Sequence, residues 1–286
     1  MARLLPLVIF VVCALPAAGG ETPSPGRRRE IRAPRRGLIH PLLDTEEVEF
    51  KEVRPFRHKV ENLRSRLKAA KKVKTLAMYF RDLDNGLAFG LDQQLAFQPA
   101  SLLKLPVMMA LLKKHESNAG LLEARVALRP MKAGELEPAF PPSKTLTPGQ
   151  EYTVDELLRA MIARSDNDAL TTLLAALDEK DYVRVYEDLG LRIPNVRDVD
   201  DPVTVREYAT FFRILYNASY LSKDLSQKAL EYLAAADLRE GLRAGLPPSV
   251  TAAHKFGEAG RANGELQFHD CGIVYHPSKP YMLCVM

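Results

Sequence analysis

A serine and a lysine interrupt a long apolar run, and this run constrains the fold more than any other stretch. Ser101 and Lys104 stand three residues apart at the head of a segment that stays apolar to Leu112. If the segment is helical, positions i and i+3 share one face, so the two side chains can meet. A helix that is apolar on all sides belongs in a protein interior. The sequence therefore predicts a buried helix that holds a hydroxyl group beside an amine.

This pair has the chemistry of an activated nucleophile. Burial favours the neutral form of an amine, which can then accept the proton of a serine hydroxyl. The same spacing also arises by chance, and a second copy stands at Ser65 and Lys68 in a charged amphipathic stretch that should face water. The apolar surroundings single out Ser101. Because Pro106 has no amide hydrogen for the Leu102 carbonyl, we expect a slight bend in the helix there.

Positive charge is concentrated near the N-terminus. The chain has a net charge of +4, but residues 1–36 carry seven arginines against two glutamates. The remainder is almost neutral, so it offers no basic surface for nucleic acid.

The first twenty residues have the pattern of a signal peptide. Arg3 precedes an apolar run from Leu4 to Leu15, and small residues follow it. The run is too short for a stable membrane span. Val12 is larger than the residue that lipoprotein sites accept before their cysteine, so we expect no lipid anchor at Cys13. These features predict export to the periplasm or the exterior, with a basic, proline-rich linker over residues 21–45.

Hydrophobic periodicity predicts a mixed order of helices and strands in the remaining domain, residues 46–286. Residues 46–72 fit an amphipathic helix broken near Pro55, and 75–81 with 87–91 fit a hairpin around Asp84-Asn85-Gly86. Further helices are expected over 153–162, 169–177, 182–189, 203–216 and 226–236, and strands over 249–256, 266–275 and 281–286. This order predicts an α+β fold: an antiparallel sheet flanked by helices, with an all-helical subdomain.

Export would leave Cys271 and Cys284 as the only cysteines. They stand on strands that we expect to be adjacent, so they could form a disulfide. With His269 and His276 they could also be drawn as a metal site, but strand alternation around a short turn explains the spacing equally well. We expect no metal and no cofactor.

Three motifs follow one another along the chain: Ser101-Leu-Leu-Lys104, Ser165-Asp166-Asn167, and His254-Lys255-Phe256-Gly257 on an expected strand. Together with residues 152–158, which run toward the second motif, they resemble the class A β-lactamases and related penicillin-recognising serine hydrolases. The resemblance covers roughly residues 46–286. It implies a β-lactamase/transpeptidase-like fold and a serine hydrolase that forms an acyl-enzyme with a β-lactam or a D-alanyl peptide.

The resemblance also implies roles for the motif residues. Ser101 would be acylated, Lys104 would accept or relay its proton, and Ser165 would pass a proton to the leaving nitrogen. Asn167 would contact Lys104 and the substrate amide, and Asp166 would hold the loop.

On the substrate side, Lys255 would supply positive charge beside Ser165 and for an anionic substrate group. Phe256, Gly257 and Glu258 would line the substrate. The amides of Ser101 and Glu258 would form the oxyanion hole.

The chain departs from the family at three points. Phe256 stands where the family has a threonine or serine whose hydroxyl binds the substrate carboxylate. Residues 190–201 contain no glutamate to activate the deacylating water, so Asp198, Asp200 or Asp201 would have to serve. The chain also stops at Met286, within its last expected strand, where the family continues into a helix. We expect the domain to lack that helix and to expose an apolar patch on the sheet.

These departures leave two alternatives to a working β-lactamase. One is a penicillin-binding or DD-peptidase-like protein with slow deacylation, and the other is a non-catalytic cell-wall-binding module. The five retained polar residues of the motifs favour an enzyme, because a binding module has no need of all of them. The expected partner is a small β-lactam or a peptidoglycan peptide, bound by a monomer.

Overall fold

The computed structural model describes residues 51–131, 140–195, 201–260 and 265–286. The expected signal peptide and linker, and also Asp198 and Asp200, lie outside these residues.

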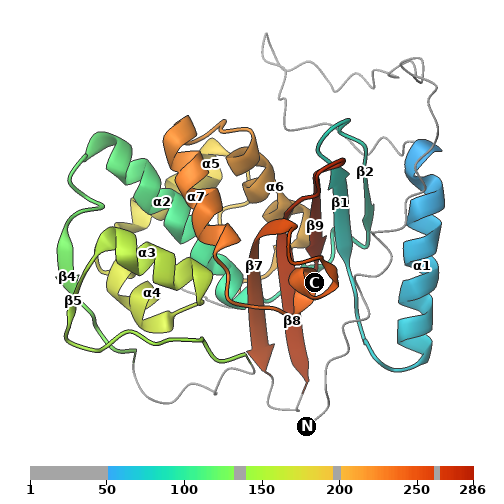
Figure 1. Cartoon of the computed structure of the whole chain (residues 1–286), viewed down its shortest axis with the longest axis horizontal. Helices are drawn as coiled ribbons and strands as arrows, with labels where there is room; N and C mark the ends of the chain where they lie inside the picture. Colours follow the sequence, from blue (N-terminus) through green and yellow to red (C-terminus); the bar gives the residue numbers. More distant parts are fainter. Residues whose placement is uncertain (1–50, 132–139, 196–200, 261–264) are drawn as a thin grey trace.

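Five strands form an antiparallel sheet in the order β2-β1-β9-β8-β7 (Figure 1). Their bounds are β1 Met78–Asp82, β2 Ala88–Leu91, β7 Thr251–Gly260, β8 Leu266–Tyr275 and β9 Tyr281–Val285. The strand predicted from the sequence over residues 266–275 has the same bounds as β8. β9 enters between the N-terminal hairpin and the β7–β8 pair, where Asp82 pairs with Tyr281 and Val274 also pairs with Tyr281. β7 lies at an edge of this sheet, and no strand among the described residues pairs with its outer side.

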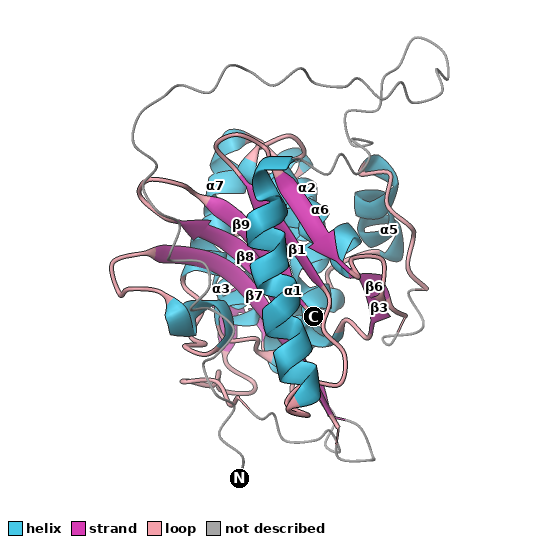
Figure 2. Ribbon diagram, turned by 90° about the vertical axis from the view of Figure 1, so that its right-hand side faces the viewer, coloured by secondary structure: helices cyan, strands magenta, loops and turns pink. Residues whose placement is uncertain are grey.

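One face of the sheet is covered by α1 (Arg54–Ala69), which follows the short 3-10 turn η1 (Lys51–Val53) (Figures 1 and 2). The expected break near Pro55 is wrong, because this proline lies in the first turn of α1, where its missing amide hydrogen costs nothing. Phe56 packs edge-on against Phe80 of β1, with ring centroids 5.1 Å apart.

The apolar patch expected on this face is also absent from the described strands. Ala252, Val274 and Leu283 are buried there together with Leu67 of α1 and Leu242. Leu242 belongs to the 3-10 turn η3 (Gly241–Gly245), which packs on β7 and β8.

The opposite face carries the helical subdomain (Figure 1). Its helices are α2 Lys104–Ser117, α3 Val154–Ala163, α4 Asn167–Leu174, α5 Glu179–Asp188, α6 Val205–Tyr216 and α7 Lys223–Ala234. The predicted buried helix is confirmed as α2, in which every residue from Lys104 to Leu112 is buried. Ser101 lies just before it in the 3-10 turn η2 (Ala100–Leu103).

Local capping explains where several of these helices begin. A capping box of Thr153 and Glu156 opens α3, and Thr204 with Glu207 forms a second box at α6. Asp166 caps α4, because its Oδ1 accepts a hydrogen bond of 2.8 Å from the Ala169 amide. The cap makes α4 begin at Asn167, two residues after Ser165.

Two small strand pairs that the sequence did not predict complete the fold. β3 (Ala96–Phe97) pairs with β6 (Val203–Thr204), and β4 (Arg125–Ala127) pairs with β5 (Glu151–Thr153). The first pair ties the chain before Ser101 to the start of α6.

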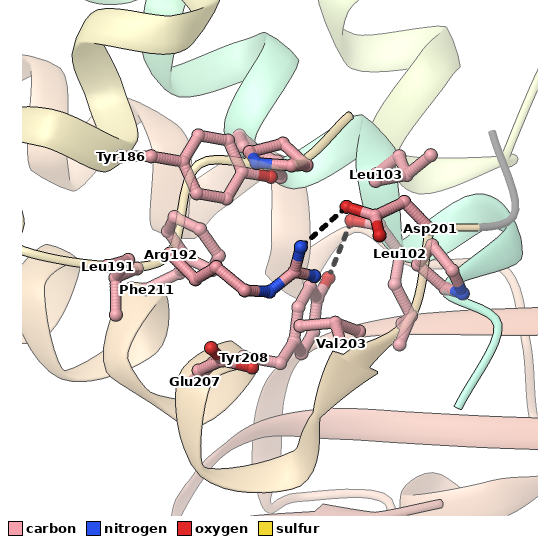
Figure 3. A pocket seen from close by; sticks show the side chains of 13 residues that line it. Leu102, Leu103, Tyr186, Leu191, Arg192, Asp201, Val203, Glu207, Tyr208 and Phe211 are labelled. Carbon is pink, nitrogen blue, oxygen red and sulfur yellow. Dashed lines mark hydrogen bonds and ion pairs between the residues drawn. The ribbon is translucent and has the colours of Figure 1, made fainter. Parts of the chain in front are cut away.

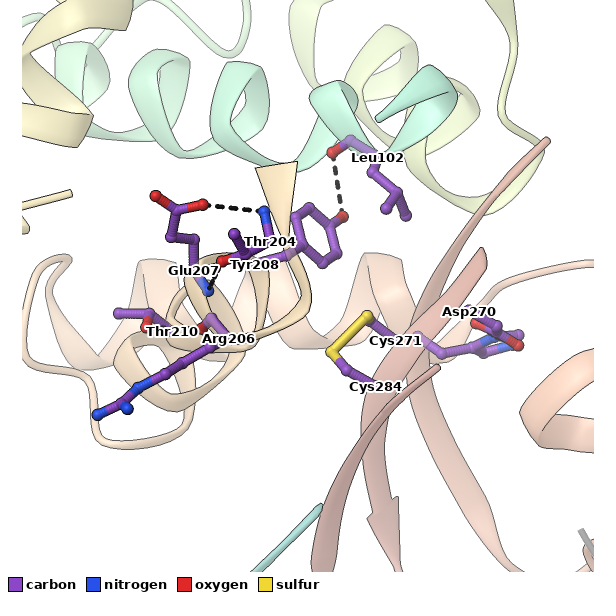
Figure 4. The surroundings of a disulfide bond; sticks show 10 residues. Leu102, Thr204, Arg206, Glu207, Tyr208, Thr210, Asp270, Cys271 and Cys284 are labelled. Atoms are coloured by element: carbon purple, nitrogen blue, oxygen red, sulfur yellow. Dashed lines mark hydrogen bonds and ion pairs between the residues drawn. A yellow bond between two sulfur atoms is a disulfide. The ribbon is translucent and has the colours of Figure 1, made fainter. Parts of the chain in front are cut away.

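A disulfide joins Cys271 of β8 to Cys284 of β9, at directly opposed positions in the sheet (Figure 4). Both residues are buried against the helical subdomain. The bond between the two cysteines favours the disulfide over the metal-site alternative. Within the described ranges there is no group of three or more His, Cys, Asp or Glu side chains placed to hold a metal. No helix in the same ranges combines the length and apolarity needed to cross a membrane.

Candidate active site

The three motifs meet where η2, α2, the start of α4 and the edge strand β7 come together. The amine of Lys104 is at the centre, and this side chain is only 1% exposed. Its Nζ lies 2.9 Å from Ser101 Oγ, 2.6 Å from Asn167 Oδ1, 2.7 Å from the Ser165 carbonyl oxygen and 3.1 Å from Ser165 Oγ.

The chemistry of these partners orients the amine. The Ser165 carbonyl and Asn167 Oδ1 can only accept, so two N–H groups of Lys104 point to them. The hydroxyls of Ser101 and Ser165 can both donate and accept, so they contact the remaining position on the nitrogen. A neutral amine in this position therefore has its lone pair available to a serine proton.

Lys255 approaches the same hydroxyl from β7. Its Nζ donates to Ser165 Oγ over 3.0 Å, and the side chain is 0% exposed. Burial, and then the neighbouring Lys104, hold the pKa of Lys255 well below its usual value. The Ser165 hydroxyl thus bridges two buried lysines, and a proton can pass between them through it.

Two backbone positions are held in the left-handed region that side chains disfavour. Ala100, just before the candidate nucleophile, has φ +48°, and Ser165 has φ +56°. Such conformations persist only where the surrounding structure enforces them, and they cluster at functional sites. Here they flank Lys104 on both sides.

Pro106 and Tyr208 fix the turn that carries Ser101. Pro106 falls in the first turn of α2, so the expected bend is not required there. The Leu102 carbonyl, which Pro106 cannot serve, accepts a buried hydrogen bond of 3.0 Å from the Tyr208 hydroxyl of α6 (Figure 4). No residue pattern marked Tyr208 in advance.

β7 comes unusually close to η2. A Cβ on Gly257 would stand 3.1 Å from the Pro99 carbonyl oxygen and 3.2 Å from the Leu102 amide nitrogen. The Phe256 carbonyl faces the free edge of β7, where it accepts from Lys255 over 2.7 Å. Since residues i and i+2 of a strand direct their backbone groups to the same side, the Glu258 amide faces that edge too. Its side chain accepts from the Phe140 amide at 3.2 Å.

The chain before Ser101 is held by a buried histidine that the sequence suggested only as part of a metal site. His269 Nε2 donates to the Gln98 carbonyl at 3.0 Å. Burial lowers the pKa of His269 to about 4, so its ring is neutral near pH 7.

Asp201 is the one candidate for the deacylation role among the described residues. It accepts hydrogen bonds of 2.7 Å from Arg192 Nη1 and from the Asn195 amide. Burial alone would raise the pKa of Asp201, but these two donors outweigh it and hold the pKa below its usual value. Figure 3 shows this ion pair at a hollow behind η2, also lined by Leu102 and Leu103; neither Ser101 nor Lys104 lines it. Asp201 is therefore engaged with Arg192, at a hollow that Ser101 does not line.

Solved structures with the same architecture include a class A β-lactamase, another β-lactamase and PBP-A. A class A β-lactamase from Mycobacterium abscessus aligns with a TM-score of 0.67 and 22% identity, over 79% of this chain and 88% of that one. A mutant of PBP-A, solved as an acyl-enzyme complex with penicillin-G, aligns at 0.64 and 24%, over 79% and 87%. A β-lactamase from Chitinophaga pinensis aligns at 0.65 and 19%, over 78% and 89%. At these identities the likeness establishes the shared fold.

A search of curated proteins by sequence gave no match. The family model of the β-lactamase enzyme family, in contrast, matches residues 56–286. That range includes η2, the start of α4 and β7, which carry the three motifs. The chain is therefore a member of the β-lactamase enzyme family.

Proposed function

We propose that this protein is a serine hydrolase that forms an acyl-enzyme at Ser101 with a β-lactam or a D-alanyl peptide, and that it releases the acyl group slowly. The observation that carries this proposal is the position of Lys104 Nζ, 2.9 Å from Ser101 Oγ and bonded to two acceptor-only oxygens.

Acylation follows from these contacts. Ser101 Oγ attacks the carbonyl carbon of the amide, and its proton moves to Lys104 Nζ. The oxyanion that forms is stabilised by the Ser101 and Glu258 amides. The C–N bond then breaks, and the leaving nitrogen takes a proton from Ser165 Oγ. That hydroxyl is reprotonated by a lysine, since both Lys104 and Lys255 reach it.

Release of the acyl group needs a water molecule and a base. A well-placed general base is worth roughly a hundred- to ten-thousandfold in rate. Asp201 is bound to Arg192 and has a lowered pKa, so it is a poor acceptor for a water proton. This favours a long-lived acyl-enzyme, as in a penicillin-binding protein, over rapid β-lactam turnover.

The test is the intact mass of the protein after incubation with a penicillin. We expect one equivalent of acyl group on Ser101, no adduct on Ser101→Ala, and an unchanged adduct on Ser65→Ala, which removes the exposed copy of the motif. An adduct that survives Ser101→Ala refutes the assignment. A folded protein that no acylating probe labels would instead be a binding module.

We also propose that the protein is exported. The support is the signal-peptide pattern of residues 1–20. Fractionation of cells that express the full chain tests it, and the expected product outside the cytoplasm is shortened near residue 20.

A further inference from the structure

Partners within the described part of the chain use every N–H group of the Lys255 amine. Its Nζ donates to Ser165 Oγ at 3.0 Å and to the Phe256 carbonyl at 2.7 Å, and it lies 4.2 Å from the centroid of the Phe256 ring. An ammonium has three N–H donors, and these three partners use them all. A neutral amine has two, and the two oxygens use both. In either state a further acceptor must displace a partner.

The Phe256 ring covers one side of the Lys255 amine. Its side chain is 5% exposed, and Lys255 is fully buried. The face of an aromatic ring carries partial negative charge and attracts a cation without a hydrogen bond. A carboxylate that reached Lys255 Nζ would have to move this ring, and a phenyl group offers no donor in return.

The charged groups around Lys255 also disfavour the binding of an anion there. Glu258 and Asp270 both raise the pKa of Lys255, against the larger effects of burial and Lys104. Asp270 lies opposite Phe256 on β8 and is itself fixed by His254 and the Leu242 amide. These two carboxylates already serve as counter-charges, so an incoming anion would add a third negative group.

We propose that Phe256 sets the substrate class of this site: it selects acyl donors whose leaving group carries no carboxylate, that is, neutral esters and amides. This inference rests on the proposed acylation of Ser101 and ranks its donors: those with a carboxylate still acylate Ser101, but more slowly than neutral ones. Penicillins and peptides that end in a free carboxylate then act as weak donors, and an ester or an internal amide fits the site better.

A matched pair of donors tests this directly. The thioester of phenylacetylglycine with thioglycolic acid carries a carboxylate on its leaving group, and the methyl ester of that compound does not. In both, Ser101 Oγ attacks the thioester carbonyl, the C–S bond breaks, and the sulfur leaves as a thiol with the serine proton. The acyl-enzyme is identical, so any difference in the rate of mass increase lies in acylation.

We expect the wild-type protein to be acylated at least about tenfold faster by the methyl ester than by the acid. Phe256→Thr, which removes the ring and adds a hydroxyl donor, should shift this ratio toward the acid by about tenfold or more. Phe256→Leu keeps the site apolar and should retain the preference for the ester. Phe268→Leu, on the neighbouring strand β8 and packed on Phe140, is the control and should leave both rates unchanged.

Several outcomes would overturn the inference. One is a wild-type protein that reacts equally with both donors or prefers the acid, and another is a folded Phe256→Thr variant with the wild-type ratio. If Phe256→Thr does not fold, the ratios of the wild type and Phe256→Leu decide, and both must favour the ester. Acylation of Ser101 by both donors at equal rates overturns only the specificity. Failure of both donors in every folded variant removes the proposed function as well.

Discussion

The hydroxyl of Tyr208 donates a hydrogen bond to the carbonyl oxygen of Leu102, from α6 to the turn that carries the candidate nucleophile. Tyr208 is buried, at 2% exposure, so water cannot replace it. Pro106 has no amide hydrogen to donate to this carbonyl, and the Tyr208 hydroxyl supplies a donor from another helix. A polar contact in the core thus holds Ser101 in place from behind.

Tyr208→Phe should therefore destabilise the protein by about 1 kcal/mol, because it removes a buried hydrogen bond to the Leu102 carbonyl. The free energy of unfolding in urea measures this. Tyr216→Phe is the control: it lies on the same helix, and its hydroxyl makes no hydrogen bond within the described part of the chain. An equal effect of the two substitutions would show that the Leu102 contact contributes nothing.

Asp201→Asn should leave the lifetime of the acyl-enzyme within about threefold of the wild type. Loss of a true general base would slow the release of the acyl group by a hundredfold or more, but Asp201 is bound to Arg192. The loss of stability should stay near or below about 1 kcal/mol, since Arg192 is half exposed, at 47%. Decay of the acyl-enzyme mass measures the lifetime. Asp188→Asn removes the acid of a surface pair on α5 and serves as the reference; a lifetime lengthened only by Asp201→Asn would identify Asp201 as the base.

His269 should make the fold sensitive to mild acid. The pKa of His269 is about 4 in the folded protein against 6.5 for a free histidine. Between these values the unfolded chain binds more protons, so stability is fully present above about pH 6.5 and is lost as the pH falls toward 4. The shift corresponds to at most about 3 kcal/mol.

His269→Gln can keep a donor for Gln98 without titrating. We expect this variant to lose much of the stability slope between pH 6.5 and 4, as followed by urea unfolding at several pH values. His58→Gln, whose histidine side chain is 73% exposed on α1, should retain the wild-type slope. An unchanged slope in His269→Gln would contradict the assignment.

Reduction of the Cys271–Cys284 disulfide should lower the free energy of unfolding by about 2–4 kcal/mol, because the bond closes a loop with a sequence separation of 13. Unfolding with and without a phosphine reductant measures this. The Cys271→Ala/Cys284→Ala double variant should match the reduced protein and ignore the reductant. If the wild type also ignores the reductant, the bond either does not form in solution or does not contribute.

The elements that the sequence predicted are those with long, regular patterns. The run after Ser101 and the alternation over β8 extend far enough for their periods to show. β3 and β6 are two residues long and have no period at all. The box at Thr204 and Glu207 carried the same signal as Thr153 and Glu156, so α6 could have been placed more sharply.

The residues of the site also divide into those that a motif predicts and those that no local pattern marks. The motifs predicted that Ser101, Lys104, Ser165, Asn167 and Lys255 would meet, because their spacing along the chain is fixed by the fold they share with the family. Tyr208 and His269 serve backbone carbonyls from distant elements, and no local pattern marks such a partner. Phe256 was expected to remove a hydrogen-bond donor to the substrate. Its contact with the Lys255 amine depends on the rotamers of two adjacent side chains of β7, which the sequence does not reveal.

The position of β9 has a consequence for how the protein is made. Its pairing of Tyr281 with Asp82 means that the centre of the sheet joins the two ends of the domain in sequence. While a ribosome is still producing the helical subdomain, β1 has no neighbour on one side, and β8 will lack one until β9 emerges. Contacts so distant along the chain form slowly, and open strand edges invite pairing with other chains in the meantime. β9 therefore decides whether the sheet closes or leaves two open strand edges that can pair with other chains.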